Sequence, residues 1–432
     1  MGQSNIFCGN SLERMLQNNK EIPIDFENSF DVVLANPPFG SKITVGSPKV
    51  NSTFDLSYKW DFDKNLNKYF KTDKTNNNPS IQVLFLELCI KLLKEKGRMG
   101  IVLPESMLSN ASTGYVVQYF LDRMNIEAVI GMPEDLFKTS GKGGTHTKTC
   151  LVIANKKSRN KKNNVDIFLA EAKYCGHDSR GNLIDRNDVK IIQENFFNKK
   201  NTSSLMGYFI SQEQVKDNIL VPRFYNPIPN SNLNKLKKTH HLYRLGNLVK
   251  DGILSISTGD EVGKSSYSTG NVPFIRTSDI SNWEIKVDPK HCISNEIYES
   301  YSNKQDVKEG DILMVKDGTY LIGSCAFVSK YDEKIVYQSH LYKLRLNDNK
   351  LINPYLLIAS LSSKIVIDQI QAKRFTQDII DSLGKRIYDL VIPIPKDNRV
   401  RNNISKIVKK SINDRINARE LAKDAKLSIV KQ

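Results

Sequence analysis

The first part of the chain alternates short apolar, β-branched runs with longer segments whose apolar residues recur at helical spacing. Residues 30–35, Phe-Asp-Val-Val-Leu-Ala, have the length and composition of a buried parallel strand. Further on, the pattern predicts helices at 81–94 and 116–123 and strands at 99–103, 126–132 and 149–154. Such alternation is typical of α/β proteins, so residues 1–192 are expected to form a parallel sheet covered by helices.

The rest of the chain follows a different pattern. Residues 193–240 are expected to be a connector that contains an extended, proline-containing stretch. Short alternating strands and glycine-punctuated turns then predict a mostly β, α+β domain at 241–395. Residues 396–432 are predicted to form an amphipathic helix. Its apolar residues recur mostly every three or four positions, at Val400, Ile404, Ile407, Val408, Ile412, Ile416 and Leu421.

Composition narrows the class of partner. With 63 Lys and Arg against 47 Asp and Glu, the 432-residue chain carries a formal charge of +16, which favours a polyanion. No apolar run approaches the roughly 18 residues of a membrane span, and no signal peptide begins at Met1, so we expect a cytoplasmic protein. The six cysteines form no C-x-x-C pair and the histidines no H-E-x-x-H motif, which argues against a metal site.

Residues 36–39, Asn-Pro-Pro-Phe, follow the first predicted strand at the end where open α/β sheets bind ligands. The side-chain carbonyl of Asn36 and the backbone carbonyl of Pro37 can accept the two hydrogens of an exocyclic amine such as that of adenine. Pro37 and Pro38 fix φ and carry no amide hydrogen, so the loop is stiff and presents acceptors without competing donors. Phe39 offers a flat face on which an extruded base can stack. The alternative is an ordinary polar turn after a strand.

Several segments together resemble a known family. The similarity is to the later half of adenine-N6 DNA methyltransferases, both the modification subunits of type I restriction systems and related fused type II enzymes. It is carried by residues 30–40, 82–87, 97–104, 127–130 and 148–153. The resemblance implies a partial Rossmann-like methyltransferase sheet, S-adenosyl-L-methionine as methyl donor, and a flipped adenine of double-stranded DNA as acceptor.

The methyl-donor side of such a site is only partly present in the sequence. The resemblance implies that Asn10 and Asn36 contact the donor, although Asn10 could equally cap a helix that starts at Leu12. Family members also carry an earlier Gly-rich strand, turn and helix followed by an acidic residue, and neither is found before residue 30. The glycines at 141–144 have no phosphate-loop spacing and suit a loop between two strands. A partner subunit that supplies these motifs is therefore expected.

Two further segments of the methylase part allow more than one interpretation. Residues 41–79 are polar with interspersed aromatic residues, and are either a lid that closes over DNA, which we favour, or a loop packed by its own rings. Asp166, Glu171 and Lys173 formally match half of a nuclease motif. Because residues 176–182 are similar to a hairpin common in the methylase family, we do not expect nuclease activity.

From about residue 243 the chain resembles the target-recognition domains of type I specificity subunits. The similarity is carried by residues 272–280, 310–318 and 338–344 and runs to the end of the chain. We expect side chains within residues 259–264 and 276–283 to read base edges, and the candidate DNA-binding residues are Lys264, Arg276, Ser278, Asp279 and Lys316. In this family the last helix is a spacer that pairs with another spacer, and the alternative is that it packs on its own domain.

Two functions follow from these patterns. The leading hypothesis is the acceptor-side half of a sequence-specific adenine-N6 methyltransferase, fused to its own target-recognition domain and completed by a partner. The alternative is a DNA-binding specificity protein that carries an inactive methylase remnant. Phosphate contacts would supply most of the DNA affinity in either case, and a few side chains would read base edges.

Overall fold

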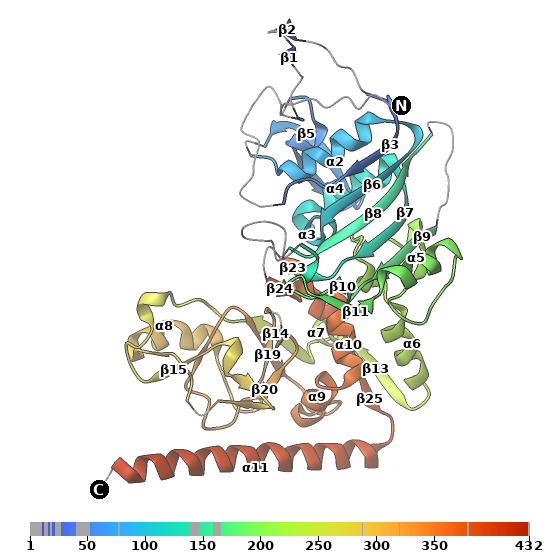
Figure 1. Ribbon diagram of the computed structural model, residues 1–432. Coiled ribbons are helices and arrows are strands. Elements are labelled where there is room, and N and C mark those ends of the chain that lie inside the picture. Colours follow the sequence, from blue (N-terminus) through green and yellow to red (C-terminus); the bar gives the residue numbers. More distant parts are fainter. Residues whose placement is uncertain are drawn as a thin grey trace. The chain divides into compact units, whose positions relative to one another are not determined.

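The chain divides into two compact units, residues 1–226 with 375–379 and residues 227–374 with 380–432 (Figure 1). The computed structural model describes residues 11–12, 16–17, 20–21, 27–39, 52–76, 78–137, 147–158, 166–286, 288–318, 320–377 and 380–430. Over these ranges, no helix combines the length and the apolar character needed to cross a lipid bilayer. Each unit has hydrophobic clusters of its own.

The first unit is built on a mixed six-stranded sheet in the order β12-β9-β7-β8-β6-β3. The strands are β3 (Phe30–Ala35), β6 (Leu93–Pro104), β7 (Met124–Gly131), β8 (Thr149–Lys156), β9 (Asp166–Glu171) and β12 (Tyr208–Ser211). β3 runs parallel to β6, and β7 runs parallel to β9. β8 lies antiparallel between β6 and β7, and β12 is antiparallel to β9.

The expectation of a parallel sheet is therefore wrong for β8, which is antiparallel to both of its neighbours. A parallel neighbour requires a crossover of a dozen or more residues, usually through a helix. In the described part of residues 132–148 there is only the short 3-10 turn Glu134–Phe137, so no α-helix is seen there to carry the chain back across the sheet. The strand after this connection enters the sheet in the opposite direction.

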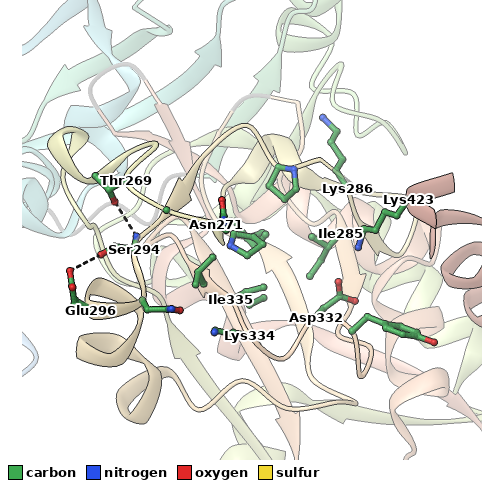
Figure 2. Close-up of a pocket in the computed structure, with 17 residues that line it drawn as sticks. Thr269, Asn271, Ile285, Lys286, Ser294, Glu296, Asp332, Lys334, Ile335 and Lys423 are labelled. Atoms are coloured by element: carbon green, nitrogen blue, oxygen red, sulfur yellow. Dashed lines mark hydrogen bonds between the residues drawn. The ribbon is translucent and has the colours of Figure 1, made fainter. Parts of the chain in front are cut away.

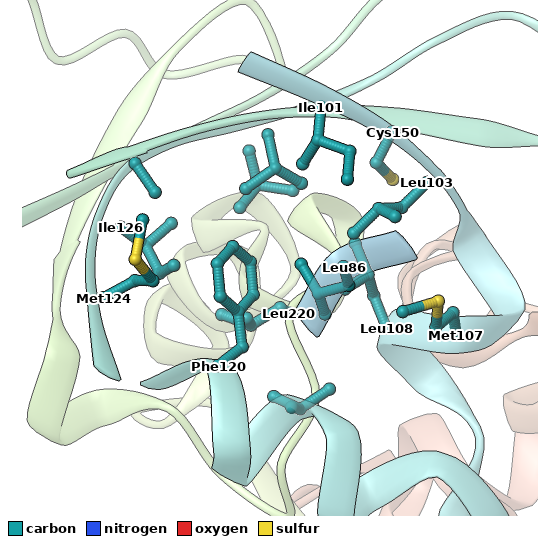
Figure 3. Packing of buried hydrophobic residues seen from close by; sticks show 14 of the residues in the cluster. Leu86, Ile101, Leu103, Met107, Leu108, Phe120, Met124, Ile126, Cys150 and Leu220 are labelled. Carbon is teal, nitrogen blue, oxygen red and sulfur yellow. The ribbon is translucent and has the colours of Figure 1, made fainter. Parts of the chain in front are cut away.

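Helices cover one face of this sheet. α2 (Ile81–Leu92) and α4 (Gly114–Arg123) follow β3 and β6 in the chain, and the short α3 (Glu105–Ser109) lies between β6 and α4. Their apolar side chains pack against alternate residues of β6, β7 and β8, including Ile101, Ile126 and Cys150 (Figure 3). On the other face, α5 (Val189–Phe197) covers β7 and β9 through Ile192 and Phe196.

The insertion between β3 and α2 contains a hairpin of β4 (Tyr58–Asp63) and β5 (Lys68–Thr75). Two smaller antiparallel pairs also lie in this unit, β1 (Leu16–Gln17) with β2 (Lys20–Glu21) and β10 (Cys175–His177) with β11 (Leu183–Asn187). β23 (Phe375–Gln377) belongs to it as well. Part of the range predicted as a connector, 193–240, instead belongs to the sheet, because it contributes β12. The chain returns to this unit at Phe375, which is buried and packs on Phe224 at 5.8 Å between ring centroids.

The second unit is rich in short strands, as predicted. Its sheets are β14-β22-β19-β20 and β18-β15-β21, together with the pairs β13-β25 and β16-β17. Their bounds are β13 (His240–Arg244), β14 (Leu254–Thr258), β15 (Val272–Ile275), β16 (Ile280–Ser281), β17 (Glu284–Ile285), β18 (Cys292–Ile293), β19 (Ile312–Val315), β20 (Cys325–Phe327), β21 (Val336–Tyr337), β22 (Leu341–Leu346) and β25 (Val391–Pro395). β15 and β21 are parallel, whereas the other pairs in these sheets are antiparallel.

Helices occur along the whole of the second unit, and the longest is the last. They are α6 (Pro227–Leu236), α7 (Leu245–Lys250), α8 (Asn295–Gln305), α9 (Pro354–Leu361), α10 (Lys364–Lys373) and α11 (Asn398–Val430). α11 confirms the amphipathic helix predicted from the spacing. Val408, Ile412 and Ile416 are buried in the core of this unit, whereas Val400 and Ile407 are exposed. One face of α11 thus packs on its own unit, and another face remains at the surface.

Candidate functional site

The Asn-Pro-Pro-Phe loop lies directly at the carboxyl end of β3. Asn36 is exposed and Pro37 is buried, so the backbone at this point is held while the amide side chain reaches the surface. Pro38 is exposed, and Phe39 is half-buried with its ring 5.3 Å from that of Phe137. The loop therefore occupies the sheet end predicted for it. Asn10 and the glycines at 141–144 lie outside the described residues.

A side chain of α2 fixes the far end of the loop. The amide nitrogen of Gln82 donates to the backbone carbonyl of Pro38 at 3.2 Å, and Ser80 donates to the amide oxygen of Gln82 at 2.9 Å. Gln82 is itself buried in the first turn of the helix. Since Gln82 already bonds the Pro38 carbonyl, the acceptors predicted for a target amine remain the side chain of Asn36 and the carbonyl of Pro37.

The described part of the 41–79 insertion is fastened to the same helix. Glu87 is buried, and its two carboxylate oxygens accept the backbone N–H groups of Asp55 and Leu56 at 2.9 and 2.8 Å. Lys91, one helical turn later, pairs with Glu87 at 2.9 Å. The base of the β4–β5 hairpin is thus tied to α2 at two successive backbone positions.

The hairpin is also packed against α4 by its aromatic residues. Trp60 stacks on Tyr115 with 5.8 Å between centroids, and the side-chain amide of Gln118 bonds both the N–H and the carbonyl of Tyr69 at 2.8 and 2.9 Å. Phe62 and Phe70 remain partly exposed, at 43% and 45%. Of the two interpretations of the insertion, packing by its own rings describes residues 52–76, and a lid function stays a prediction.

A buried ion cluster lies at the same edge of the sheet as the loop. Glu105 follows the end of β6, Glu171 ends β9, and Lys148 precedes the antiparallel β8. Arg223 pairs with Glu105 and lies 3.4 Å from Glu171, which also pairs with Lys148. Burial would raise the pKa of the Glu171 carboxyl, but Lys148 and Arg223 outweigh it and lower this pKa to about 2. Sequence patterns did not predict this cluster.

This cluster bears on the nuclease-like match. Glu171 is engaged by two cations, and one of its oxygens, Oε2, is buried without a hydrogen-bond partner in the described structure. Lys173 is exposed. No group of three or more potential metal-binding side chains occurs in the described ranges. The Glu171 carboxylate therefore belongs to an ion-paired cluster.

The predicted DNA-reading residues of the second unit have different surroundings. The guanidinium of Arg276 lies 3.1 Å from the Nε2 of His291, and its Nε donates to the side-chain oxygen of Gln338 at 3.4 Å. The ring of His291 in turn stacks on Tyr267, with 4.2 Å between centroids. Ser278 and Lys264 are exposed. Asp279 is buried, and its carboxylate accepts the backbone N–H of Arg276 at 2.9 Å. Asp279 thus shapes the turn that carries Arg276.

Lys316 belongs to a neighbouring polar group. Its ammonium lies 3.3 Å from Asp317, which also contacts His340 at 2.8 Å. His340 and Gln338 lie on one short segment after β21, and Gln338 contacts Arg276. The segment 338–340 therefore connects the surroundings of Arg276 and Lys316, and sequence reasoning did not assign it a DNA contact.

A cavity of about 580 Å³ lies elsewhere on the second unit (Figure 2). Its lining combines Lys286, Lys334 and Lys423 with Asp332, and Lys423 comes from α11. The wall is stabilised by a hydrogen bond from the N–H of Ser294 to Thr269 at 3.0 Å. None of the five predicted DNA-reading residues lines this cavity.

Each of the two parts of the chain matches a known protein family. The family model for N-6 DNA methylase matches residues 2–228, and that for the type I restriction modification DNA specificity domain matches residues 251–424. The chain is 23% identical over 192 residues to the type I restriction enzyme MpnII methylase subunit of Mycoplasma pneumoniae, covering 44% of this chain and 32% of that subunit. It is 24% identical over 131 residues to a putative type II restriction enzyme and methyltransferase of Methanocaldococcus jannaschii, covering 30% and 9%.

Solved structures show similar proteins at low identity. The type IIG restriction endonuclease BpuSI is 12% identical, with a TM-score of 0.33 over 76% of this chain and 44% of that one. A type I methyltransferase subunit from Streptococcus thermophilus is 21% identical, with a TM-score of 0.36 over 49% and 40%. A type I S subunit from Mycoplasma genitalium is 13% identical, with a TM-score of 0.29 over 46% of each chain.

The chain spans about a third of the length of the first of these curated relatives and about a tenth of the second. The methylase model nevertheless covers more than half of the chain, and the specificity model covers most of the remainder. The chain therefore belongs to the N-6 DNA methylase family and carries a type I restriction-modification DNA specificity domain after its methylase part.

Proposed function

We propose that this chain is the acceptor-side half of a DNA adenine-N6 methyltransferase that carries its own target-recognition domain. The observation that supports this most directly is the placement of residues 36–39 at the carboxyl end of β3, where the Gln82 side chain holds the Pro38 carbonyl at 3.2 Å. Open α/β sheets bind ligands at this end of their strands. The family match supports the same assignment.

In this proposal the residues of the loop have separate tasks. Asn36 and the carbonyl of Pro37 accept the two hydrogens of the adenine amine, which raises the electron density on its nitrogen. Phe39 stacks on the flipped base. When bound, S-adenosyl-L-methionine would supply the methyl group and leave as the demethylated thioether. Asn36 and the Pro37 carbonyl would hold the amine during the transfer, and the proton that its nitrogen loses would pass to water at the exposed Asn36 side chain. Stiffness of the loop matters because small misplacements of reacting groups reduce rates strongly.

Binding of the methyl donor is proposed to need a partner polypeptide. The described residues before α2, at 27–39 and 52–76, contain no glycine, so no glycine turn for the methionine group lies among them. A polypeptide with a Gly-rich strand, turn and helix would supply it. Double-stranded DNA would bind through the second unit, with Arg276, Lys316 and Lys264 as contacts, and the pairing of α11 with another spacer helix remains a prediction.

The test is incorporation of labelled methyl groups from S-adenosyl-L-methionine into mixed-sequence DNA. The chain is assayed alone and with the product of the adjacent gene. Asn36→Ala should abolish labelling while DNA binding persists, whereas Asn198→Ala, at an exposed position after α5, should leave both unchanged. Absence of labelling in both wild-type mixtures would exclude a catalytic role and favour the alternative, a specificity protein with an inactive methylase remnant.

A further inference from the structure

The outermost strand of the methylase sheet has an unusual exposure pattern. β3 has a described strand neighbour, β6, on one side only. Val33 and Ala35 pack on the core beneath α2 and α4. Residues that point to the opposite face are exposed, with Phe30 at 40%, Val32 at 58% and Leu34 at 81%. An apolar strand edge of this kind is a template for another chain.

The exposure extends from the edge into the sheet face. Leu34 pairs with Gly100 of β6, and its side chain lies over this glycine: a Cβ atom on Gly100 would come within 2.8 Å of it. Val102 of β6 and Ile153 of β8 point to the same face and are only half-buried. Further along, β7 and β9 are covered by α5. Within the described ranges, helix α5 therefore covers this face over β7 and β9. Beside β3 the same face is apolar and exposed to solvent.

The handedness of α/β connections indicates what covers this face. From β3 the chain passes through α2 to the parallel strand β6, and this crossover lies on the Val33 face. Crossovers between parallel strands are right-handed. If an added chain passes from a strand beside β3 to strands farther out, it moves across the sheet in the opposite direction, so right-handed crossovers place its helices on the opposite face. That is the face of Phe30, Val32 and Leu34.

The direction of the added strand determines where a ligand would bind. A strand parallel to β3 ends beside Asn36, and the sheet order would then reverse at β3. Ligands of open α/β sheets bind in the crevice at such a reversal point. A second copy of this chain fits less well, because two β3 edges related by a two-fold axis pair antiparallel and place their Asn36 residues at opposite ends.

We propose that β3 and the face of Phe30, Val32 and Leu34 form the docking surface for the donor-binding half of the methyltransferase. The occupant is a partner polypeptide whose strand pairs parallel with β3 and whose following helix covers Val32 and Leu34. This inference rests on the proposed function, because it identifies the surface through which the split site is completed. The crevice for the methyl donor then forms between Asn36 and the end of the partner strand.

The test uses the full chain and the product of the adjacent gene, selected for a Gly-rich strand, turn and helix. Because Val32 and Leu34 are exposed in the chain alone, the double variant Val32→Lys, Leu34→Lys should fold, which circular dichroism and DNA binding verify. It should bind the partner at least about 100-fold more weakly, as expected from two apolar side chains that lose their burial. Leu183→Lys, at a 92% exposed position of β11, is the matched control and should bind as the wild type does.

Hydrogen exchange gives a second measurement. The amides of residues 30–35 that face away from β6 should become protected when the partner binds. Unchanged partner affinity of the double variant, absence of a complex with the selected partner, or a homodimer of this chain that the double variant abolishes would each overturn the proposal.

These outcomes are separable from failure of the proposed function. A β3-dependent complex that methylates no DNA would support the docking surface and exclude the activity. Methylation that persists at the wild-type rate in the double variant would support the activity and exclude the docking surface. Asn36→Ala provides the complementary control, since it should retain the complex and lose the activity.

Discussion

The side chain of Gln82 holds the backbone carbonyl of Pro38 at 3.2 Å, across 44 positions of sequence. Replacement of Gln82 by Leu removes the amide that donates this hydrogen bond to the Pro38 carbonyl. Pro37 and Pro38 make the loop stiff, so a movement of the Pro38 carbonyl should also displace the side chain of Asn36. We expect the single-turnover rate of methyl transfer to fall by about 10- to 100-fold.

The measurement for Gln82→Leu is single-turnover labelling in the presence of the partner. DNA affinity should stay unchanged, since the residues predicted to contact DNA belong to the other unit. Gln193→Leu, at an exposed position of α5, is the control. A wild-type rate in Gln82→Leu would show that the loop keeps its geometry without this bond.

Glu87 should contribute strongly to the stability of the first unit. The two oxygens of Glu87 accept the backbone N–H groups of Asp55 and Leu56. In Glu87→Gln one oxygen becomes an NH₂ group, which cannot accept a hydrogen bond from the N–H opposite it. We expect a loss of about 1–3 kcal/mol in the free energy of unfolding. In a Trp283→Phe background Trp60 is the only tryptophan, so its fluorescence during urea denaturation reports the unit that contains the hairpin. An unchanged midpoint would contradict the prediction.

Glu171 should make stability depend on pH in the acid range. Its pKa in the folded chain is about 2, below the ordinary value of 4.5, so the unfolded chain binds its proton more tightly. The stabilisation is therefore complete above about pH 4.5 and decreases as the pH falls toward 2, and it amounts to roughly 3 kcal/mol. Urea denaturation of wild type and Glu171→Gln, again followed by Trp60, should show a difference that is large at pH 7 and smaller at pH 3. A difference that does not change with pH would exclude this ionisation as its cause.

Arg276 and Lys316 should affect DNA binding in distinct ways. If Arg276 reads a base edge, Arg276→Ala should reduce discrimination between sites by about 1–3 kcal/mol. If Lys316 contacts phosphate, Lys316→Ala should weaken binding to all sequences and reduce the slope of log K against log salt by about one. Salt-dependent binding isotherms for specific and scrambled duplexes separate the two, with exposed Lys250→Ala as control. Equal effects on both duplexes for Arg276→Ala would contradict base reading.

The local elements could be predicted from sequence because short-range patterns determine them. The β-branched run gave β3 at residues 30–35, and apolar spacing gave α11. The burial predicted for β3 was wrong, because Val32 and Val33 are equally apolar and the pattern does not reveal whether a neighbouring strand is present. The direction of β8 was missed for a similar reason, since a strand rich in apolar residues looks alike in parallel and antiparallel sheets.

Contacts between distant residues account for what the sequence did not reveal at the site. Gln82 and Glu87, which bond the loop of residues 36–39 and the hairpin segment, belonged to a segment that resembled the family but had no predicted role of their own. The pairing of Arg223 with Glu105 spans 118 positions, and no local pattern indicates it. Asp279 was a reasonable candidate for a base contact by type, yet the structure shows it capping the turn of Arg276.

The path of the chain at Phe375 affects how new target specificities could arise by module exchange. Residues 375–379 belong to the methylase unit although the flanking residues belong to the recognition unit. Phe375 is fully buried there, against Phe224 and beneath Arg223. If a foreign recognition domain replaced everything after residue 227, Phe375 would be lost from the core of the methylase unit. A working chimera must therefore also carry an aromatic residue at the position equivalent to Phe375.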